Sequence, residues 1–336
     1  MPYYRHVGDI PPKRHVAFHD AEGHRLHEEL MGQEGFSSRS ALLYHHHAPS
    51  AITAIEAVSD AHVDGASADH PLAPRHIRTG DLGVSGDIVT GRRVLLANAD
   101  VRIGWASATS SSPLYRNATG DELIYAQRGE AVLESVFGRL PVGEGDYVIV
   151  PASTTHRWVM PEDAAGFDAL IVESRGHVSP PTRYLSSGGQ FLEHAPYCER
   201  DVRAPDDVLI EHGEHVDVLV RGTGGLSLHT HRRHPFDVVG WDGHLYPWAF
   251  SIHDFEPIVG RIHQPPPVHQ TFEGPGFVVC SFVPRLYDFH PDAVKVPYHH
   301  ANTDSDEVLF YSAGNFMIRA GSGIGVGSLS FHPAGF

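Results

Sequence analysis

Cysteine and long apolar runs are both scarce in this sequence. Cys198 and Cys280 are the only cysteines among 336 residues, so the chain carries no disulfide framework. A chain of this length also buries enough surface to fold without such cross-links. The apolar stretch from Phe277 to Val283 is far too short to span a bilayer. Because Met1 to Pro12 contains no apolar core of a signal peptide, we expect a cytoplasmic protein.

Basic residues are also in short supply. Lys and Arg number 25 against 41 Asp and Glu, which gives a formal net charge of −16. A surface of that sign repels phosphate backbones and anionic lipids. The composition therefore argues against nucleic-acid binding and against binding at a membrane surface.

Long uninterrupted helical segments are missing as well. The 34 glycines and 25 prolines divide the chain into short segments, many of them rich in Val, Ile, Leu, Tyr and Phe. Short segments of this composition between turns are typical of an all-β sandwich or barrel. One segment, Arg25–Met31, favours one or two helical turns instead. The expected strands include Arg93–Leu96, Glu122–Ala126, Tyr147–Val150, Ala169–Val172, Val216–Val220, Phe277–Val283 and Glu307–Tyr311.

An internal repeat is the most informative pattern. Asn, Glu and Gly recur at identical spacing at two places, offset by 185 residues: Asn117, Glu122 and Gly129, then Asn302, Glu307 and Gly314. A second shared piece follows each copy at an offset of 182: Gly145, Asp146 and Pro151, then Gly327, Ser328 and Pro333. The repeat predicts two β units of similar length, each with matching strands and turns.

The repeat suggests a division of the chain into three parts. We expect an N-terminal β domain over residues 1–173 that contains the first unit. Residues 174–235 are richer in polar and charged residues and read as a connector with some strands of its own. We expect residues 236–336 to form a C-terminal domain with the second unit, cut short at its C-terminal end.

The repeated pattern, with a His ahead of the Glu and a further His after the Pro, is typical of a cupin barrel. Every second residue of a strand points into such a barrel, so two His and one Glu can meet on its inner face. Two imidazoles and a carboxylate form the set of ligands that holds Fe(II) with open positions for substrate and O2. The pattern therefore predicts an iron site wherever all three ligands are present.

The two copies differ in these ligands. The first has Tyr115 at the leading position, with Glu122 and His156, and we expect this barrel to hold no metal. In the second copy His300 and Glu307 fit the metal-ligand positions. By the spacing of the first copy, the third ligand should lie at position 338, beyond Phe336.

Other histidines near the second copy are less informative. The chain contains 27, and most should be surface residues. His229, His231 and His234 surround two arginines, whose charge would repel a metal cation, so a surface or interface turn is favoured there. His269 follows three consecutive prolines that form a rigid extended segment, which could direct it at a site or into the core.

Several long runs of sequence resemble bacterial homogentisate 1,2-dioxygenases of the cupin superfamily, and the resemblance extends from about Val7 to Phe336. The matching runs are KRHVAFHDAEG, EELMGQEGFSSRSALLYH, HTHRRHPFDVVGWDG, HQPPPVHQTFE, GFVVCSFVPRLYDFHP and HHANTDSDEVLFY. This resemblance implies an all-β fold of two cupin-type jelly rolls. It also implies an Fe(II) site in the C-terminal jelly roll and assembly of the chains into trimers or hexamers.

The resemblance also implies roles for individual residues. His300 and Glu307 match two iron ligands. His269 matches the histidine that handles a proton of the substrate hydroxyl, and His332 matches a second histidine beside the substrate ring. Two further positions match tyrosines that contact the substrate carboxylate: Tyr298 and Phe316, the latter without a hydroxyl to donate.

The implied reaction is ring cleavage of a hydroquinone acid by Fe(II) and O2. In the family the substrate is homogentisate and the product is maleylacetoacetate, a step of tyrosine and phenylalanine catabolism. An alternative from a different class is a metal-free protein of two cupin units that binds a small aromatic acid without catalysis. A third and less favoured reading is a cupin isomerase or epimerase with His269 or His332 as its base.

Overall fold

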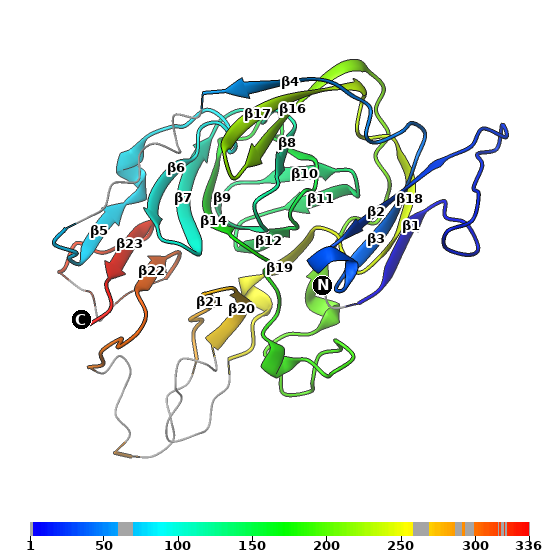
Figure 1. Ribbon diagram of the computed structural model, residues 1–336. Helices are drawn as coiled ribbons and strands as arrows, with labels where there is room; N and C mark the ends of the chain where they lie inside the picture. The colour runs from blue at the N-terminus through cyan, green and yellow to red at the C-terminus, as the bar shows by residue number, and fades with distance from the viewer. Residues whose placement is uncertain are drawn as a thin grey trace.

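The computed structural model describes residues 3–59, 70–257, 269–285, 291–292, 299–314, 316, 319 and 321–335. Within these ranges the chain is almost entirely β-structure, as the sequence predicts (Figure 1). The helical segments described are short 3-10 turns: η1 (Glu34–Phe36), η2 (Thr79–Leu82), η3 (Thr182–Tyr184), η4 (Glu199–Asp201) and η5 (Ile252–Asp254).

Two seven-stranded sheets form the centre of the molecule. The first contains, in spatial order, β11 (Gly138–Val142), β10 (Ala131–Ser135), β13 (His156–Val159), β8 (Tyr115–Asn117), β16 (Glu214–Gly222), β17 (Gly225–Arg233) and β4 (Ile52–Val58). The second contains β15 (Val202–Arg203), β19 (Trp248–Ser251), β12 (Asp146–Val150), β9 (Glu122–Arg128), β14 (Phe167–Ser174), β7 (Val101–Ala108) and β6 (Arg93–Ala97). We call these sheets S1 and S2.

S1 and S2 face each other across an apolar core, which makes them the jelly roll expected for the first cupin unit. The alternation of side chains along each strand produces this core. On β11, Leu140 and Val142 point inward while Arg139 is exposed. Trp158 of S1 packs in the same cluster as Ile171 of S2.

A four-stranded sheet lies beside the jelly roll, with the order β1 (Arg5–Gly8), β18 (Val238–Gly243), β3 (Ser40–His45) and β2 (His27–Gly32). The prediction of helical turns at Arg25–Met31 was wrong, because residues 27–32 form β2 and pair with β3. Glu, Leu and Met are good helix formers, but helix propensity amounts to only tenths of a kcal/mol per residue, and pairing with a buried neighbouring strand outweighs it.

Strands from the end of the chain form two smaller sheets. One is the pair β20 (Gln270–Gly274) and β21 (Phe277–Cys280). The other has the order β22 (Glu307–Tyr311), β23 (Ser328–His332) and β5 (Arg75–Arg78). In Figure 1 the red β23 lies beside the cyan β5, so a segment from early in the chain completes a sheet of the second unit.

The sequence repeat is reproduced in the pairing of the strands. β9 pairs antiparallel with β12, and Glu122 lies opposite Val150. β22 pairs antiparallel with β23, and Glu307 lies opposite His332. The offsets of 185 and 182 convert the first register into the second, so the two copies share one strand arrangement.

The repeated glycines have a backbone reason. Gly129 and Gly314 have φ values of 84° and 93°, and Gly145 and Gly327 have 88° and 79°. Residues with a side chain rarely adopt positive φ, whereas glycine does so readily. Each copy therefore needs glycine at the same two turns.

Strands from all three expected parts of the chain share sheets. β16, within residues 174–235, pairs parallel with β8 of the first unit, and β19 from beyond residue 236 pairs with β12. The boundaries at 173 and 235 stay a prediction.

The HTHRRHP run lies mainly on β17 rather than in a turn, and it buries His231 and His234. Cys198 and Cys280 are free thiols, as expected. No helix in the described ranges is long and apolar enough to cross a membrane.

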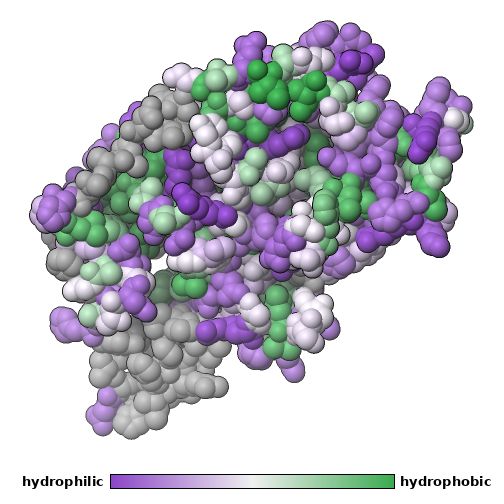
Figure 2. Space-filling view, in the orientation of Figure 1, coloured by the Kyte–Doolittle hydropathy of each residue, from purple (hydrophilic) through white to green (hydrophobic). Residues whose placement is uncertain are grey.

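One apolar patch is exposed on the edge strand of S1. Ile52 and Ile55 of β4 are both exposed, and Figure 2 shows the apolar surface above this strand. The patch lies on the opposite side of S1 and S2 from the small sheets that carry the second copy (Figure 1).

Candidate functional site

The carboxylate of Glu307 lies between two imidazoles. Its Oε2 is 2.8 Å from Nδ1 of His332, and its Oε1 is 3.6 Å from Nε2 of His300. Glu307 and His332 meet because they are opposite residues of β22 and β23. All three side chains are partly exposed, at 28% for Glu307, 29% for His332 and 51% for His300. The structure therefore brings together His300, Glu307 and His332, three of the residues singled out in the sequence.

A second group of side chains of metal-binding types lies elsewhere in the structure, near the N-terminus. In the described part of the chain, only the ligand atoms of Asp20, Glu22 and His24 form a set of three that all lie within 4.8 Å of one another. These residues surround a turn and hydrogen-bond among themselves, with Asp20 accepting from the backbone of Glu22 and His24. Exposed acidic groups of this kind are common without a metal, so the group carries no functional assignment.

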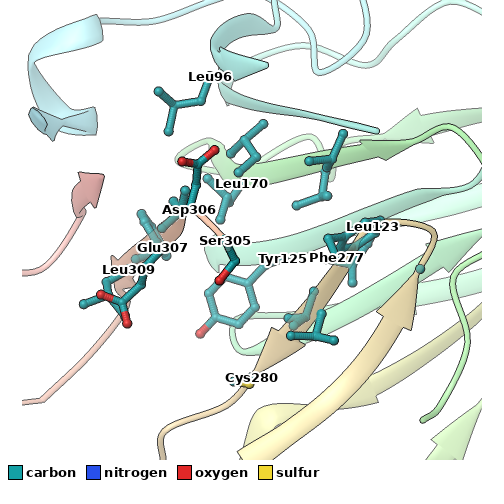
Figure 3. A pocket seen from close by; sticks show the side chains of 18 of the residues that line it. Leu96, Leu123, Tyr125, Leu170, Phe277, Cys280, Ser305, Asp306, Glu307 and Leu309 are labelled. Carbon is teal, nitrogen blue, oxygen red and sulfur yellow. The ribbon is translucent and has the colours of Figure 1, made fainter. Parts of the chain in front are cut away.

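We call His300, Glu307 and His332 the Glu307 cluster. This cluster lies in the wall of a large cavity of about 2640 Å³. The cavity is bounded by β22, by the β20–β21 pair and by strands β9, β12 and β14 of S2. Figure 3 shows Glu307 and Leu309 of β22 on one side, with Leu123 and Phe277 across from them and Tyr125 between. Apolar and aromatic side chains surrounding a few polar ones are typical of a site for a small organic ligand.

His269 lines the same cavity and is buried. Its Nδ1 has no hydrogen-bond partner in the structure, and its ring packs on Phe282 at 4.6 Å between centroids. Burial lowers the pKa of His269, and the positive charge of Arg285 adds to this effect, so that the pKa falls to about 4. At neutral pH the ring is therefore uncharged, and its unpartnered nitrogen can accept a hydrogen bond.

Of the two residues expected to contact the substrate carboxylate, Tyr298 and Phe316, the structure describes only Phe316. Tyr298 lies outside the described residues. Phe316 lines the cavity and packs edge-on against Tyr311, with ring centroids 4.8 Å apart. A phenyl ring offers contact to the substrate but no hydrogen bond.

Sequence reasoning missed two polar groups in this cavity. The hydroxyl of Tyr311 and Nε of Arg319 are both buried, and neither has a hydrogen-bond partner in the structure. Tyr311 lies on the same face of β22 as Glu307, four residues further on. That spacing along a strand was the available signal, whereas nothing in the sequence distinguishes Arg319.

Comparison with known proteins identifies the family. The chain is 36% identical over 337 residues to a protein of Saccharolobus solfataricus described as a "putative dioxygenase", and the match covers 100% of this chain and 86% of that protein. A sequence model described as the N-terminal part of homogentisate 1,2-dioxygenase matches residues 87–252. The chain belongs to the homogentisate 1,2-dioxygenase family.

More distant members of the homogentisate dioxygenase family also match. The homogentisate 1,2-dioxygenase of Emericella nidulans is 27% identical over 66% of this chain and 48% of its own length. That of Rhodopseudomonas palustris is 24% identical over 71% of this chain and 54% of its own length. The chain thus spans about half the length of these two relatives. Among solved structures, a cupin-2 domain protein of Shewanella frigidimarina has 16% identity and a TM-score of 0.23, over 25% of this chain and 78% of that one.

Membership of the homogentisate dioxygenase family makes this chain a cupin-type dioxygenase. The family model covers the first barrel and ends ahead of the cavity strands β20 to β23. The family model thus covers strands of S1 and S2, whereas the match to the Saccharolobus solfataricus protein also includes the second copy, which carries Glu307.

Proposed function

We propose that the protein is an Fe(II)-dependent, ring-cleaving dioxygenase. Its substrate is homogentisate or a closely related hydroquinone acid, and its product is a ring-opened acid of the maleylacetoacetate type. The observation that carries the proposal is the position of Glu307 between His300 and His332 on the wall of a largely apolar cavity that also contains His269.

His300 and Glu307 supply two of the three groups of a donor set that suits ferrous iron. Two neutral imidazoles and one carboxylate are the donor set that suits Fe(II) in oxygenases. His300 and Glu307 would hold the metal, together with the further histidine that stays a prediction at position 338. When bound, the iron supplies the activation of O2 that an all-protein site lacks.

The protein's own residues would bind the substrate and move its proton. His269 is uncharged at neutral pH, so its unpartnered Nδ1 can accept a hydrogen bond from a phenolic hydroxyl and orient the proton that leaves it. Leu123, Tyr125 and Phe277 would cover the faces of an aromatic ring and exclude water. His332 would act beside the ring as a second polar contact.

Assembly is a separate part of the proposal. The family resemblance favours a homo-oligomer, a trimer or a hexamer. The mass of the protein in solution, measured by light scattering, would test this without reference to activity.

Oxygen consumption by the iron-loaded, full-length protein tests the proposed reaction. Uptake of one O2 per homogentisate supports it, whereas no uptake by folded protein carrying one iron per chain would overturn it. Methylhydroquinone, which lacks the carboxylate, tests the substrate class and should be turned over poorly. Glu56→Gln on the exposed strand β4 is the matched control for Glu307→Gln and should keep full activity.

The metal-free alternative is excluded or supported by elemental analysis. One iron per chain, lost in Glu307→Gln and kept in Glu56→Gln, excludes a non-catalytic cupin. Tight binding of homogentisate by metal-free protein, with no iron retained after loading, would favour that alternative.

A further inference from the structure

The first barrel contains a buried cluster of charges at the position that matches the Glu307 site. Glu122 is 1% exposed and is the first residue of β9, just as Glu307 is the first residue of β22. Its carboxylate accepts hydrogen bonds from Arg92 at 2.8 and 3.4 Å, from Asn117 at 2.9 Å and from the hydroxyl of Tyr115 at 3.1 Å. A carboxylate this buried needs a cation or several donors, and here it has both.

His156 completes the correspondence. It lies directly opposite Tyr115 in the pairing of β13 with β8, and the two rings meet edge-on with centroids 5.5 Å apart. The His156 side chain is fully buried, and its Nε2 has no hydrogen-bond partner in the structure. A buried imidazole nitrogen without a partner is unusual, and it is one that a metal ion would satisfy.

Arg92 supplies the positive charge next to Glu122 in this cluster, and a second buried guanidinium, that of Arg221, donates to the hydroxyl of Tyr115 at 3.2 Å. The Arg92 guanidinium is 2% exposed, donates to both Glu122 and Glu173, and lies 5.3 Å from the ring centroid of Tyr115. The Arg92 guanidinium thus contacts both groups that stand at ligand positions, the Glu122 carboxylate and the Tyr115 ring. A metal ion bound to Glu122 would be in direct conflict with this charge.

We propose that the first barrel is a cation site whose cation is the guanidinium of Arg92. The barrel keeps Glu122 and His156 at ligand positions, while the arginine fills the place of a metal ion and Tyr115 replaces the leading histidine. The site is therefore closed to metals in the native protein, and each chain has one site open to iron rather than two.

A metal titration tests this assignment in a background of Glu307→Gln, which removes the second-copy site. Tyr115→His combined with Arg92→Ala should bind one Co2+ per chain, seen as the visible absorption of the protein-bound ion. Tyr115→His alone should bind none, because Arg92 still occupies the site. The further change Glu122→Gln in the double variant should abolish binding.

The same titration can overturn the proposal. Equal Co2+ binding by Tyr115→His with and without Arg92 would show that the guanidinium does not fill the metal position. Failure of the folded double variant to bind Co2+ would show that Glu122 and His156 are not arranged as ligands. Binding that survives Glu122→Gln would place the metal elsewhere.

A second measurement decides the matter if the double variant does not fold. Arg92→Ala leaves a cavity shaped for a guanidinium, so millimolar methylguanidinium should raise its melting temperature, and equimolar tetramethylammonium should not. The parent protein should respond to neither ion. Equal effects of the two ions on Arg92→Ala, or no effect of either, would overturn the proposal.

Discussion

The two copies of the repeat have the same strand register but differ in how their glutamates are compensated. Glu122 is 1% exposed and is paired with a guanidinium that the chain itself provides. Glu307 is 28% exposed, is flanked by two imidazoles and faces a cavity. In the first copy the glutamate is buried against an arginine of the same chain. In the second copy the glutamate is accessible to a ligand. We call the first copy closed and the second open.

The comparison shows that a strand arrangement does not determine a site. A buried carboxylate destabilises a fold unless a positive charge or several donors compensate it. The first copy meets this requirement with Arg92, and so it can serve as a rigid wall: Leu123, directly after Glu122, lines the cavity of the second copy. In the second copy the requirement is weaker, because Glu307 is partly exposed to solvent and its carboxylate lies 2.8 Å from Nδ1 of His332.

The largest expected effect is on activity, from Glu307→Gln. An amide is a weaker metal ligand than a carboxylate, so we expect iron retention and oxygen uptake to fall to background. The free energy of unfolding of the metal-free protein should change by less than about 1 kcal/mol, because the side chain is partly exposed. Metal analysis, an oxygen electrode and thermal melts measure these three quantities. Iron near one equivalent in this variant would remove Glu307 from the ligand set.

His332→Val makes the second copy resemble the first at one position, since Val150 stands at the equivalent register. If His332 contacts the substrate ring and helps to position it, kcat should fall by about 100-fold, because a substrate misplaced by about 1 Å reacts that much more slowly. Iron content should stay near one equivalent. Steady-state kinetics with metal analysis provides the check, and loss of iron along with activity would mean that His332 is itself a ligand.

Glu122→Gln should lower stability and leave iron content unchanged, which is the reverse of the result expected for Glu307→Gln. Removing one partner of a buried ion pair costs about 3–5 kcal/mol of stability. Arg92 keeps Glu173 at 3.0 Å, which places the expected loss at the lower end of that range. Iron content should not change. Denaturant unfolding of both variants measures the contrast, and equal stability losses would contradict the distinction between a closed and an open copy.

The smallest expected effect is on the pH dependence of stability. Burial lowers the pKa of His269 to about 4, below the value of about 6.5 for an unfolded chain. The unfolded state then binds the proton more tightly, so stability is lost as pH falls from about 6.5 to 4, by about 1–3 kcal/mol. His269→Gln should remove this part of the acid-side loss in melts of the metal-free protein. If His269→Gln does not change the loss of stability at low pH, other buried histidines, including His156 of the first copy, are responsible for that loss.

Local sequence spacing predicted much of the fold and part of the candidate site. The expected strand at Glu307–Tyr311 is β22, and that at Glu122–Ala126 lies within β9. The pairing of Glu307 with His332 follows from the repeat only once the structure gives the register of Glu122 opposite Val150. These strands could be predicted because turn residues mark their ends and because apolar and polar side chains alternate along them. Both signals lie in residues that are close together in the sequence.

Contacts between distant segments were not predictable in this way. Arg92 lies thirty residues from Glu122 and eighty-one from Glu173, and no spacing connects them. β5 joins β23 across most of the chain length, and Arg25–Met31 favours a helix that the pairing of β2 with β3 overrides.

The sequence by itself therefore predicted two similar β units and the residues that we propose as iron ligands. The sequence also favoured a metal-free first unit, but only the tertiary structure shows that Arg92 compensates the charge of its buried glutamate. The physical reason is that the free-energy cost of burying a charge depends on all the groups packed around it. Those groups come from distant parts of the sequence, so the local pattern does not reveal them.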